Sequence, residues 1–307
     1  MHTAYISHEE FLKHDMGPDH PECPARMYAV KDQLIASGLL DYLSQHQAPR
    51  ANKTQLARVH SADYIDWVFA QAPNSGLIDL DGDTAMNAYT LDAALYAAGA
   101  VVQAVDLVMA GQVSNAFCNV RPPGHHAKRT GASGFCIFNN VAVGAAHALH
   151  HHGLERVAVI DFDVHHGDGT QDIFQDDDRV LMCSIFQHPY YPYCGADAGN
   201  AHIINVPLAA GSDGEQLRAV VTDHWLPALE RFQPQMLLIS AGFDAHREDD
   251  MGGLALREAD YLWLTETLKT VAKRHAQGRI VSALEGGYAL HALGRSVMTH
   301  VKCLSEL

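Results

Sequence analysis

The sequence predicts an α/β protein built around one mainly parallel β-sheet. Strand-like and helix-like runs alternate along all 307 residues, which favours parallel strands joined by helices. The strand-like runs are short and continuously apolar, as is typical of buried strands. We find no Pro/Ser-rich linker, internal repeat or low-complexity tract. We therefore predict a single domain over residues 1–307.

The elements can be assigned from these apolar patterns in chain order. The buried strands are expected in four runs: Asn115–Val120, Val157–Ile160, the run from Leu237 and the run from Ile280. The predicted helices, the second of which Gly111 would stop, are Ala25–Ser37, Thr90–Ala110, Asn139–His152, Glu215–Arg231 and Arg257–His275.

The most informative segment is Asp-Phe-Asp-Val-His-His-Gly-Asp-Gly-Thr at residues 161–170, directly after a predicted strand. Alternate residues of a strand point to the same side, so Asp161, Asp163 and His165 should project together. They would do so at the edge of the sheet where α/β proteins place ligands. Two carboxylates and an imidazole at one point require a cation between them. An ordinary Asp/Gly-rich turn is the alternative for this segment alone.

Three other strand-like runs also end in residues suited to chemistry. Arg-Pro-Pro-Gly-His-His-Ala at 121–127 is a stiff loop that can aim His125 and His126, and histidine exchanges protons near neutral pH. The run from Leu237 leads to Asp244. The run from Ile280 leads through Gly-Gly to Tyr288, and two glycines allow the phenol a close approach to a ligand. Four such strand ends predict one shared catalytic site.

Histidine alone is weak evidence in this chain, which contains 21 of them. The triplet His150–His152 ends a predicted helix just before Gly153. We interpret it as a solvated helix end, which the helix dipole favours.

Composition narrows the class of protein. The formal net charge is −15, from 36 acidic and 21 basic residues, and no basic stripe is present, which argues against nucleic-acid binding. An acidic surface suits a cationic substrate, although solubility alone explains it equally well.

The six cysteines form no CxxC pair, and several lie in apolar runs, which indicates a reducing compartment. The N-terminus MHTAYISHEEF lacks the pattern of a signal peptide. No apolar run reaches about 18 residues, so we expect no membrane span and a cytoplasmic protein. The sequence does not decide between a monomer and a homo-oligomer.

Together these segments resemble the zinc-dependent histone deacetylase family, including its bacterial deacetylase-like and acetylpolyamine amidohydrolase members. The resemblance rests on RPPGHHA, DFDVHHGDGT and LEGGY, on GASGFC at 131–136 and SAGFDAH at 240–246, and on His20-Pro-Glu-Cys-Pro-Ala-Arg26. LEGGY is more similar to class II members. The resemblance implies the arginase-like deacetylase fold, with a central parallel sheet of about eight strands flanked by helices.

The resemblance also implies roles for the residues at the strand ends. Asp163, His165 and Asp244 would hold one catalytic Zn²⁺ and leave a position open for water and substrate. Because two ligands are carboxylates, Fe²⁺ or Co²⁺ could also fit. His126 would act as general base and His125 would help to protonate the leaving amine, while Tyr288 would stabilise the oxyanion. Asp161 would orient His125, and Asp168 would orient His126.

Two further sites follow from the resemblance. A structural K⁺ would be bound by main-chain oxygens, together with the Asp161 carboxylate, at the positions Asp161, Asp163, His165, Ser184 and Ile185. A narrow tunnel for the acyl-lysine stem would be lined by Gly134, Phe135, Tyr191 and Met251.

Three functions compete: a deacylase of acyl-lysine in peptides or proteins, a deacetylase of small acetylated amines such as acetylpolyamines, and a non-catalytic acyl-lysine or partner-binding module. Polyamine-preferring relatives carry an acidic gatekeeper where we align the apolar Met251. A shift of one residue would change this, because Glu248, Asp249 and Asp250 are close by. Candidates for gripping the substrate backbone are Asp79, Asp81 and Asp83, but Asp81-Gly-Asp83-Thr could instead cap the next helix.

Overall fold

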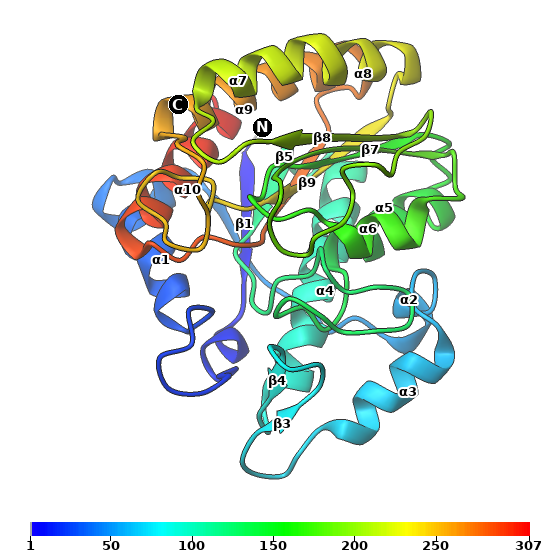
Figure 1. Cartoon of the computed structure of the whole chain (residues 1–307), viewed down its shortest axis with the longest axis vertical. Coiled ribbons are helices and arrows are strands. Elements are labelled where there is room, and N and C mark those ends of the chain that lie inside the picture. Colours follow the sequence, from blue (N-terminus) through cyan, green and yellow to red (C-terminus); the bar gives the residue numbers. More distant parts are fainter. Residues whose placement is uncertain (1) are drawn as a thin grey trace.

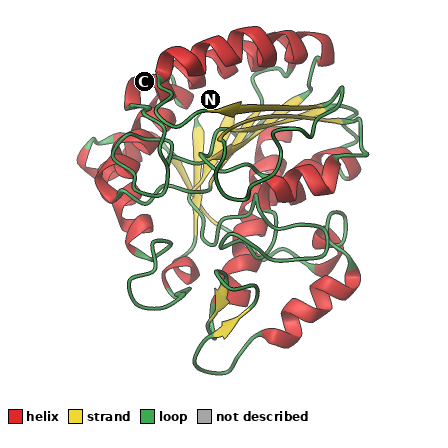
Figure 2. Cartoon of the chain, in the orientation of Figure 1, coloured by secondary structure: helices red, strands yellow, loops and turns green. Residues whose placement is uncertain are grey.

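The structure, a computed structural model, describes residues 2–307; residue 1 of the predicted domain lies outside the described residues. Figure 2 shows its helices, strands and loops. The strands are β1 (Thr3–Ser7), β2 (Ser44–Gln47), β3 (Ile78–Asp79), β4 (Ala85–Met86), β5 (Asn115–Cys118), β6 (Val157–Asp161), β7 (Val180–Gln187), β8 (Ile203–Leu208), β9 (Met236–Ala241) and β10 (Ile280–Leu284).

The α-helices are α1 (Ala25–Ala36), α2 (Lys53–Leu56), α3 (Ala62–Gln71), α4 (Thr90–Met109), α5 (Asn140–His150), α6 (Asp168–Phe174), α7 (Gly214–Val220), α8 (Leu226–Phe232), α9 (Glu258–His275) and α10 (Leu290–Leu304). Two short 3₁₀ turns, Glu9–Leu12 and Leu39–Tyr42, complete the set with a π-helical turn at Val221–Trp225.

Eight strands form one sheet in the order β2-β1-β5-β10-β9-β6-β7-β8, and every pairing in it is parallel. The predicted parallel sheet of about eight strands is confirmed. The short strands β3 and β4 make a separate antiparallel hairpin, at the lower end of the molecule in Figure 1.

Both faces of the sheet are covered by helices, as the continuous apolar strands predict. Along β6, Val157 and Val159 contact the core formed with α4 and α5, whereas Ala158 and Ile160 contact the core formed with α1, α9 and α10. In Figure 1, α7 and α8 lie above the sheet, and α4 and α5 lie below it.

The predicted helix boundaries agree within one or two residues, with one exception. The segment predicted as the helix Glu215–Arg231 consists of α7, the π turn Val221–Trp225 and α8. Pro227, in the first turn of α8, has no N–H for the helical hydrogen-bond ladder. The π turn lies directly before α8.

The expectation about apolar runs needs a correction for α4. An 18-residue window of this helix has a mean hydropathy of 1.5, so by length and composition α4 could cross a membrane. However, 67% of that window is buried inside the fold. Its apolar character is explained by packing between α5 and the sheet. The cysteines, all of them within the described residues, are free.

Candidate active site

The site lies at the carboxyl edge of five neighbouring strands. The loops after β5, β10, β9, β6 and β7, which are adjacent in that order, supply the tandem histidines, Tyr288, Asp244, the Asp163–His165 pair and Tyr191. These residues are far apart in the sequence. The parallel sheet brings them together because all its strands end at one edge.

Asp163, His165 and Asp244 converge as predicted. One possible ligand atom from each lies within 4.8 Å of the other two, and all three residues are buried. Nδ1 of His165 lies 3.0 Å from Oδ1 of Asp163 and 3.3 Å from Oδ2 of Asp244. Each of the three residues comes from a loop, since β6 ends at Asp161 and β9 ends at Ala241.

Asp161 does not join this group, so the expectation that it projects together with Asp163 and His165 is wrong. The strand ends at Asp161 and the backbone then turns, which breaks the alternation of strand side chains. Its Oδ2 instead lies 3.0 Å from Nδ1 of His125.

The three converging residues fit a divalent cation. Oδ2 of Asp244 is buried and has no hydrogen-bond donor, and burial together with Asp163 raises the pKa of Asp244 to about 7. A bound cation would offset the unfavourable free energy of burying these two carboxylates next to each other. Gly286 leaves the necessary space, since a Cβ at this position would overlap the carboxylate of Asp244. Its N–H donates to Oδ2 of Asp163 at 2.8 Å.

The adjacent histidines have different electrostatic environments. Nδ1 of His126 lies 2.7 Å from Asp168, which also pairs with Lys128 at 2.9 Å. Burial and the neighbouring His125 lower the pKa of His126 to about 4, although Asp168 opposes them. Burial alone would lower the pKa of His125 too, but Asp161 and Asp163 hold it well above its usual range. The pKa values of the two adjacent imidazoles are thus shifted in opposite directions.

The loop that carries Tyr288 is held from two sides. The buried carboxylate of Asp249 accepts hydrogen bonds from the N–H groups of Tyr288 at 2.6 Å and Ala289 at 2.8 Å. On the other side, the guanidinium of Arg26 lies 4.9 Å from the centre of the Tyr288 ring. Nε of Arg26 donates to the carbonyl of Gly287 at 2.7 Å. These contacts fix the direction of the phenol.

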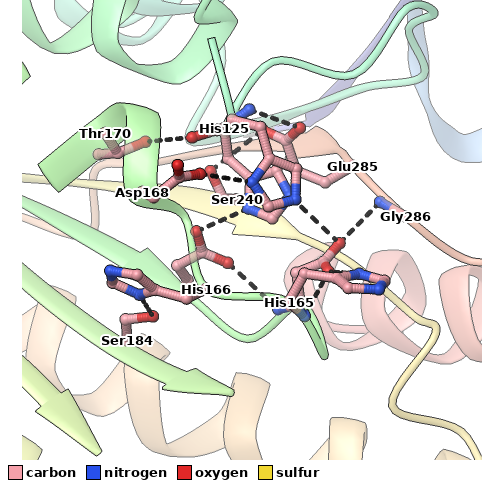
Figure 3. Close-up of polar contacts among 12 residues, drawn as sticks. His125, His165, His166, Asp168, Thr170, Ser184, Ser240, Glu285 and Gly286 are labelled. Carbon is pink, nitrogen blue, oxygen red and sulfur yellow. Dashed lines mark hydrogen bonds and ion pairs between the residues drawn. The ribbon is translucent and has the colours of Figure 1, made fainter. Parts of the chain in front are cut away.

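Glu285 belongs to the LEGGY segment, and no role is predicted for it from the sequence. The structure gives it one. Its carboxylate is fully buried and accepts the N–H groups of Gly124 at 2.6 Å and His125 at 3.1 Å, as well as the Ser240 hydroxyl at 3.1 Å (Figure 3). Since Tyr288 follows three residues later, Glu285 connects the histidine loop to the tyrosine loop. Only an acidic residue in an otherwise apolar strand end could have indicated this beforehand.

The segment His20–Arg26 also supports the site. Glu22 is completely buried between two arginines, Arg26 and Arg121, and its pKa lies well below its usual range: burial would raise it, but Arg121 and His14 outweigh burial. Arg121 begins the histidine loop and Arg26 contacts the tyrosine loop. This buried ion network therefore also connects the histidine loop to the tyrosine loop.

A cavity of about 260 Å³ leads to these groups. It is lined by Asp83, Pro123, His125, His126, Gly134, Phe135, His165, Tyr190, Tyr191, Tyr193, Met251, Gly286 and Tyr288. The predicted tunnel residues Gly134, Phe135, Tyr191 and Met251 are all among them. Gly134 has φ +54°, and a Cβ there would overlap the ring of His126, so this position requires glycine. Tyr190 and Tyr193 were not predicted, because an aromatic-rich loop alone does not show which rings face inward.

Of the loop residues 248–251, only Met251 lines the cavity. Oε1 of Glu248 pairs with Arg295 at 2.9 Å, and Asp249 is occupied by backbone N–H groups. Asp250 is exposed and is not part of the lining. The cavity lining thus includes Met251, which we align with the gatekeeper position, and none of the three acidic residues before it.

The acidic stretch at 79–83 forms the β3–β4 turn and does not cap a helix. Carboxylates of Asp79 and Asp81 accept backbone N–H groups of the turn, for example that of Gly82 at 2.7 Å. Asp83 alone of the three lines the cavity. The hydroxyl of Thr84 accepts the N–H of Phe135 at 2.9 Å and so connects this turn to the tunnel wall.

The predicted potassium positions lie on two paired strands and the loop that follows. Asp161 on β6 is in register with Ser184 on β7, and Ile185 is the next residue along β7. Asp163 and His165 follow in the loop after β6. All five residues are buried.

Comparison with known proteins agrees with this geometry. A family model described as the histone deacetylase domain matches residues 20–304. The chain is similar to a histone deacetylase-like amidohydrolase from Pseudomonas aeruginosa, with 39% identity over 94% of this chain and 82% of the relative. It is similar to the human polyamine deacetylase HDAC10, with 36% identity over 99% of this chain and 48% of that protein. A crystal structure of the HDA15 HD domain superposes with a TM-score of 0.94 at 32% identity, covering 100% of this chain and 90% of that one.

Proposed function

We propose that this chain, which belongs to the histone deacetylase family and is a hydrolase acting on amides, removes acetyl or related acyl groups from the side-chain amine of acyl-lysine. The single observation that carries the proposal is the cavity of about 260 Å³. It is lined by both histidines of the pair and by Tyr288, together with His165 of the three-residue metal-ligand set.

Asp163, His165 and Asp244 would hold a zinc ion, and iron(II) or cobalt(II) would suit the same ligands. When bound, the ion would polarise the amide carbonyl and lower the pKa of a water molecule beside it. A potassium ion beside this site is part of the same proposal. It would use main-chain oxygens of Asp161, Asp163, His165, Ser184 and Ile185, because the strand register brings Asp161 next to Ser184.

The protein's own groups then carry the proton steps. His126, with Asp168 on its other nitrogen, takes the proton from the attacking water at Nε2. His125, oriented by Asp161, gives a proton to the departing amine. Tyr288 donates its hydroxyl hydrogen to the oxygen on which negative charge develops. This complete set of groups favours an enzyme over a non-catalytic binding module.

Acyl-lysine is favoured over acetylpolyamine by the mouth of the cavity. An acetylpolyamine carries a secondary ammonium that a carboxylate would have to meet at this level, and Met251 offers none. Asp83 also lines the cavity; its Oδ1 accepts the Thr84 hydroxyl at 3.0 Å, which leaves its other oxygen to accept N–H groups of a substrate backbone or to attract a cation. The similarity to a polyamine deacetylase supports the second candidate function, deacetylation of acetylpolyamines.

One experiment separates the two substrates. We expect kcat/KM for an acetyl-lysine peptide to exceed that for N8-acetylspermidine by at least about tenfold, measured side by side on the metal-loaded protein. Met251→Glu should move this ratio toward the polyamine, whereas Asp250→Asn, an acidic residue outside the cavity, should leave it unchanged. A parent that prefers N8-acetylspermidine would establish the polyamine alternative. Turnover of neither substrate would contradict the proposed activity.

A further inference from the structure

A second group of histidines and a carboxylate lies away from the cavity, where α4 and α5 end side by side. Asp106 is in the last turn of α4, His147 is in the last turn of α5, and His151 and His152 follow α5. One possible ligand atom from each of these four residues lies within 4.8 Å of the other three. We call them the helix-end cluster.

The side chains of the helix-end cluster face one another. Oδ1 of Asp106 lies 2.7 Å from Nε2 of His147 and 2.7 Å from Nε2 of His152. His147 and His151 are one helical turn apart, and their rings stack with centres 4.7 Å apart and planes at 14°. The ring of His152 lies 4.8 Å from that of His151.

The backbone turn after α5 places His152 next to Asp106. Gly153 has φ +69°, and the N–H of Leu154 bonds to the carbonyl of Ala148, a turn that closes the helix and folds the chain back. The side chains of His147 and His152 are 4% and 20% exposed. The interpretation of the His150–His152 triplet as a solvated helix end is therefore wrong for His152.

We propose that the helix-end cluster binds a divalent transition-metal ion, with Asp106, His147, His151 and His152 as its ligands. Three imidazole nitrogens and one carboxylate oxygen are a ligand set for tetrahedral zinc. The same donors would also accept copper, nickel or cobalt, whereas calcium and magnesium require mostly oxygen ligands. A bound ion would hold α4 to α5 at their ends.

Arg58 supplies an internal test of this proposal. Its Nη1 lies 2.7 Å from Nδ1 of His147, so in the metal-free protein Nδ1 accepts a hydrogen bond and Nε2 carries the proton that faces Asp106. Coordination through Nε2 moves this proton to Nδ1, where it would oppose the Arg58 donor. Arg58, which is only partly buried, must then turn away. Its presence should weaken metal binding.

The experiment is a titration of the zinc-loaded protein, freed of excess metal, with zinc chloride. We expect a second equivalent with a Kd at or below about 10 µM by calorimetry, and a higher Tm as this equivalent binds. His151→Ala should weaken the second equivalent by at least about tenfold, while His150→Ala, the exposed neighbour outside the cluster, should not change it. Both variants should keep deacetylase activity. Asp244→Ala should lose the first equivalent and keep the second.

Three results would overturn the assignment. One is the absence of a second equivalent up to about 1 mM zinc. Another is an equal effect of His150→Ala and His151→Ala, since this would indicate non-specific binding by surface histidines. The third concerns Arg58→Ala, which should tighten the second equivalent severalfold. Unchanged or weaker binding in that variant would exclude Nε2 of His147 as a ligand.

Discussion

The catalytic cluster and the helix-end cluster use the same kinds of side chain in opposite surroundings. Asp163, His165 and Asp244 are buried at the ends of parallel strands, and one oxygen of Asp244 has no hydrogen-bond donor. In the helix-end cluster, Asp106 is 47% exposed and its Oδ1 is already bonded to two imidazoles. Burial therefore makes a cation necessary in the first cluster, whereas in the second a cation must compete with existing hydrogen bonds and with water.

The comparison also involves the surroundings of each cluster. Around the catalytic residues, Glu285, Asp249 and the Glu22 network hold the loops by buried charges. Around the helix-end cluster, the geometry is set by the packing of α4 against α5, by the contact with Arg58 and by the Gly153 turn, without buried ion pairs of this kind among the described residues. We therefore expect substitutions near the cavity to have larger effects than substitutions at the helix ends.

The largest effect is expected for Asp244→Ala. Loss of this ligand should remove the catalytic metal and lower kcat/KM by about a thousandfold or more, because a catalytic ion supplies several kcal/mol of transition-state stabilisation. Metal analysis and an acetyl-lysine assay measure both quantities, with His151→Ala as the matched ligand removal in the other cluster. Full metal content with normal turnover in Asp244→Ala would show that this cluster is not the catalytic metal site.

Tyr288→Phe comes next. If the phenol donates to the oxyanion, its loss should lower kcat by roughly a hundredfold or more, while KM moves much less and the metal stays bound. The deficit should shrink for trifluoroacetyl-lysine, whose carbonyl is already electrophilic. Steady-state kinetics with the two substrates provide the check. Turnover of acetyl-lysine within about threefold of the parent would leave Tyr288 with a packing role only.

Glu285→Gln tests the connection between the two catalytic loops. A neutral amide can accept both N–H groups with its oxygen and donate its NH₂ to the Ser240 hydroxyl, but it lacks the negative charge that strengthens the two N–H bonds. Hydrogen bonds to charged groups contribute about 1 kcal/mol more than neutral ones. We expect kcat to fall about tenfold with little change in KM, and Tm to fall by several degrees. Glu248→Gln, which affects only a surface pair with Arg295, serves as control. Identical behaviour of the two variants would remove this role from Glu285.

The smallest effect concerns a histidine that belongs to neither cluster. His300 is buried with only the hydroxyls of Thr265 and Ser282 as partners, and burial lowers its pKa to about 3. The unfolded chain takes up this proton near pH 6.5, well before the folded protein does. The contribution of neutral His300 to stability is therefore complete above about pH 6.5 and is lost as the pH falls toward 3, by about 1–2 kcal/mol at pH 5.

Denaturant unfolding at pH 7.5 and pH 5 measures this difference. His300→Gln keeps a polar group of similar reach but does not titrate, so its loss of stability on acidification should be smaller than that of the parent. Equal losses in both proteins would mean that His300 contributes nothing to the acid sensitivity of the fold.

The fold class, most helix boundaries and the strand ends that carry reactive side chains could be predicted from the amino-acid sequence. The physical reason is that apolar runs of strand length must be buried, and parallel strands must end at one edge. That was enough to predict that His125, His126 and Tyr288 would lie close to the group of Asp163, His165 and Asp244. It was also enough to recognise the family that the comparison confirms.

Which side chains turn toward one another beyond the strand ends could be learned only from the folded chain. Asp161 left the metal group because the backbone bends after β6, and Glu285 gained its role from a loop 160 residues away in the chain. The helix-end cluster depends on how α4 and α5 pack, and helix periodicity does not contain that information. Side-chain direction in loops and at helix crossings is set by long-range packing, which a local pattern does not record.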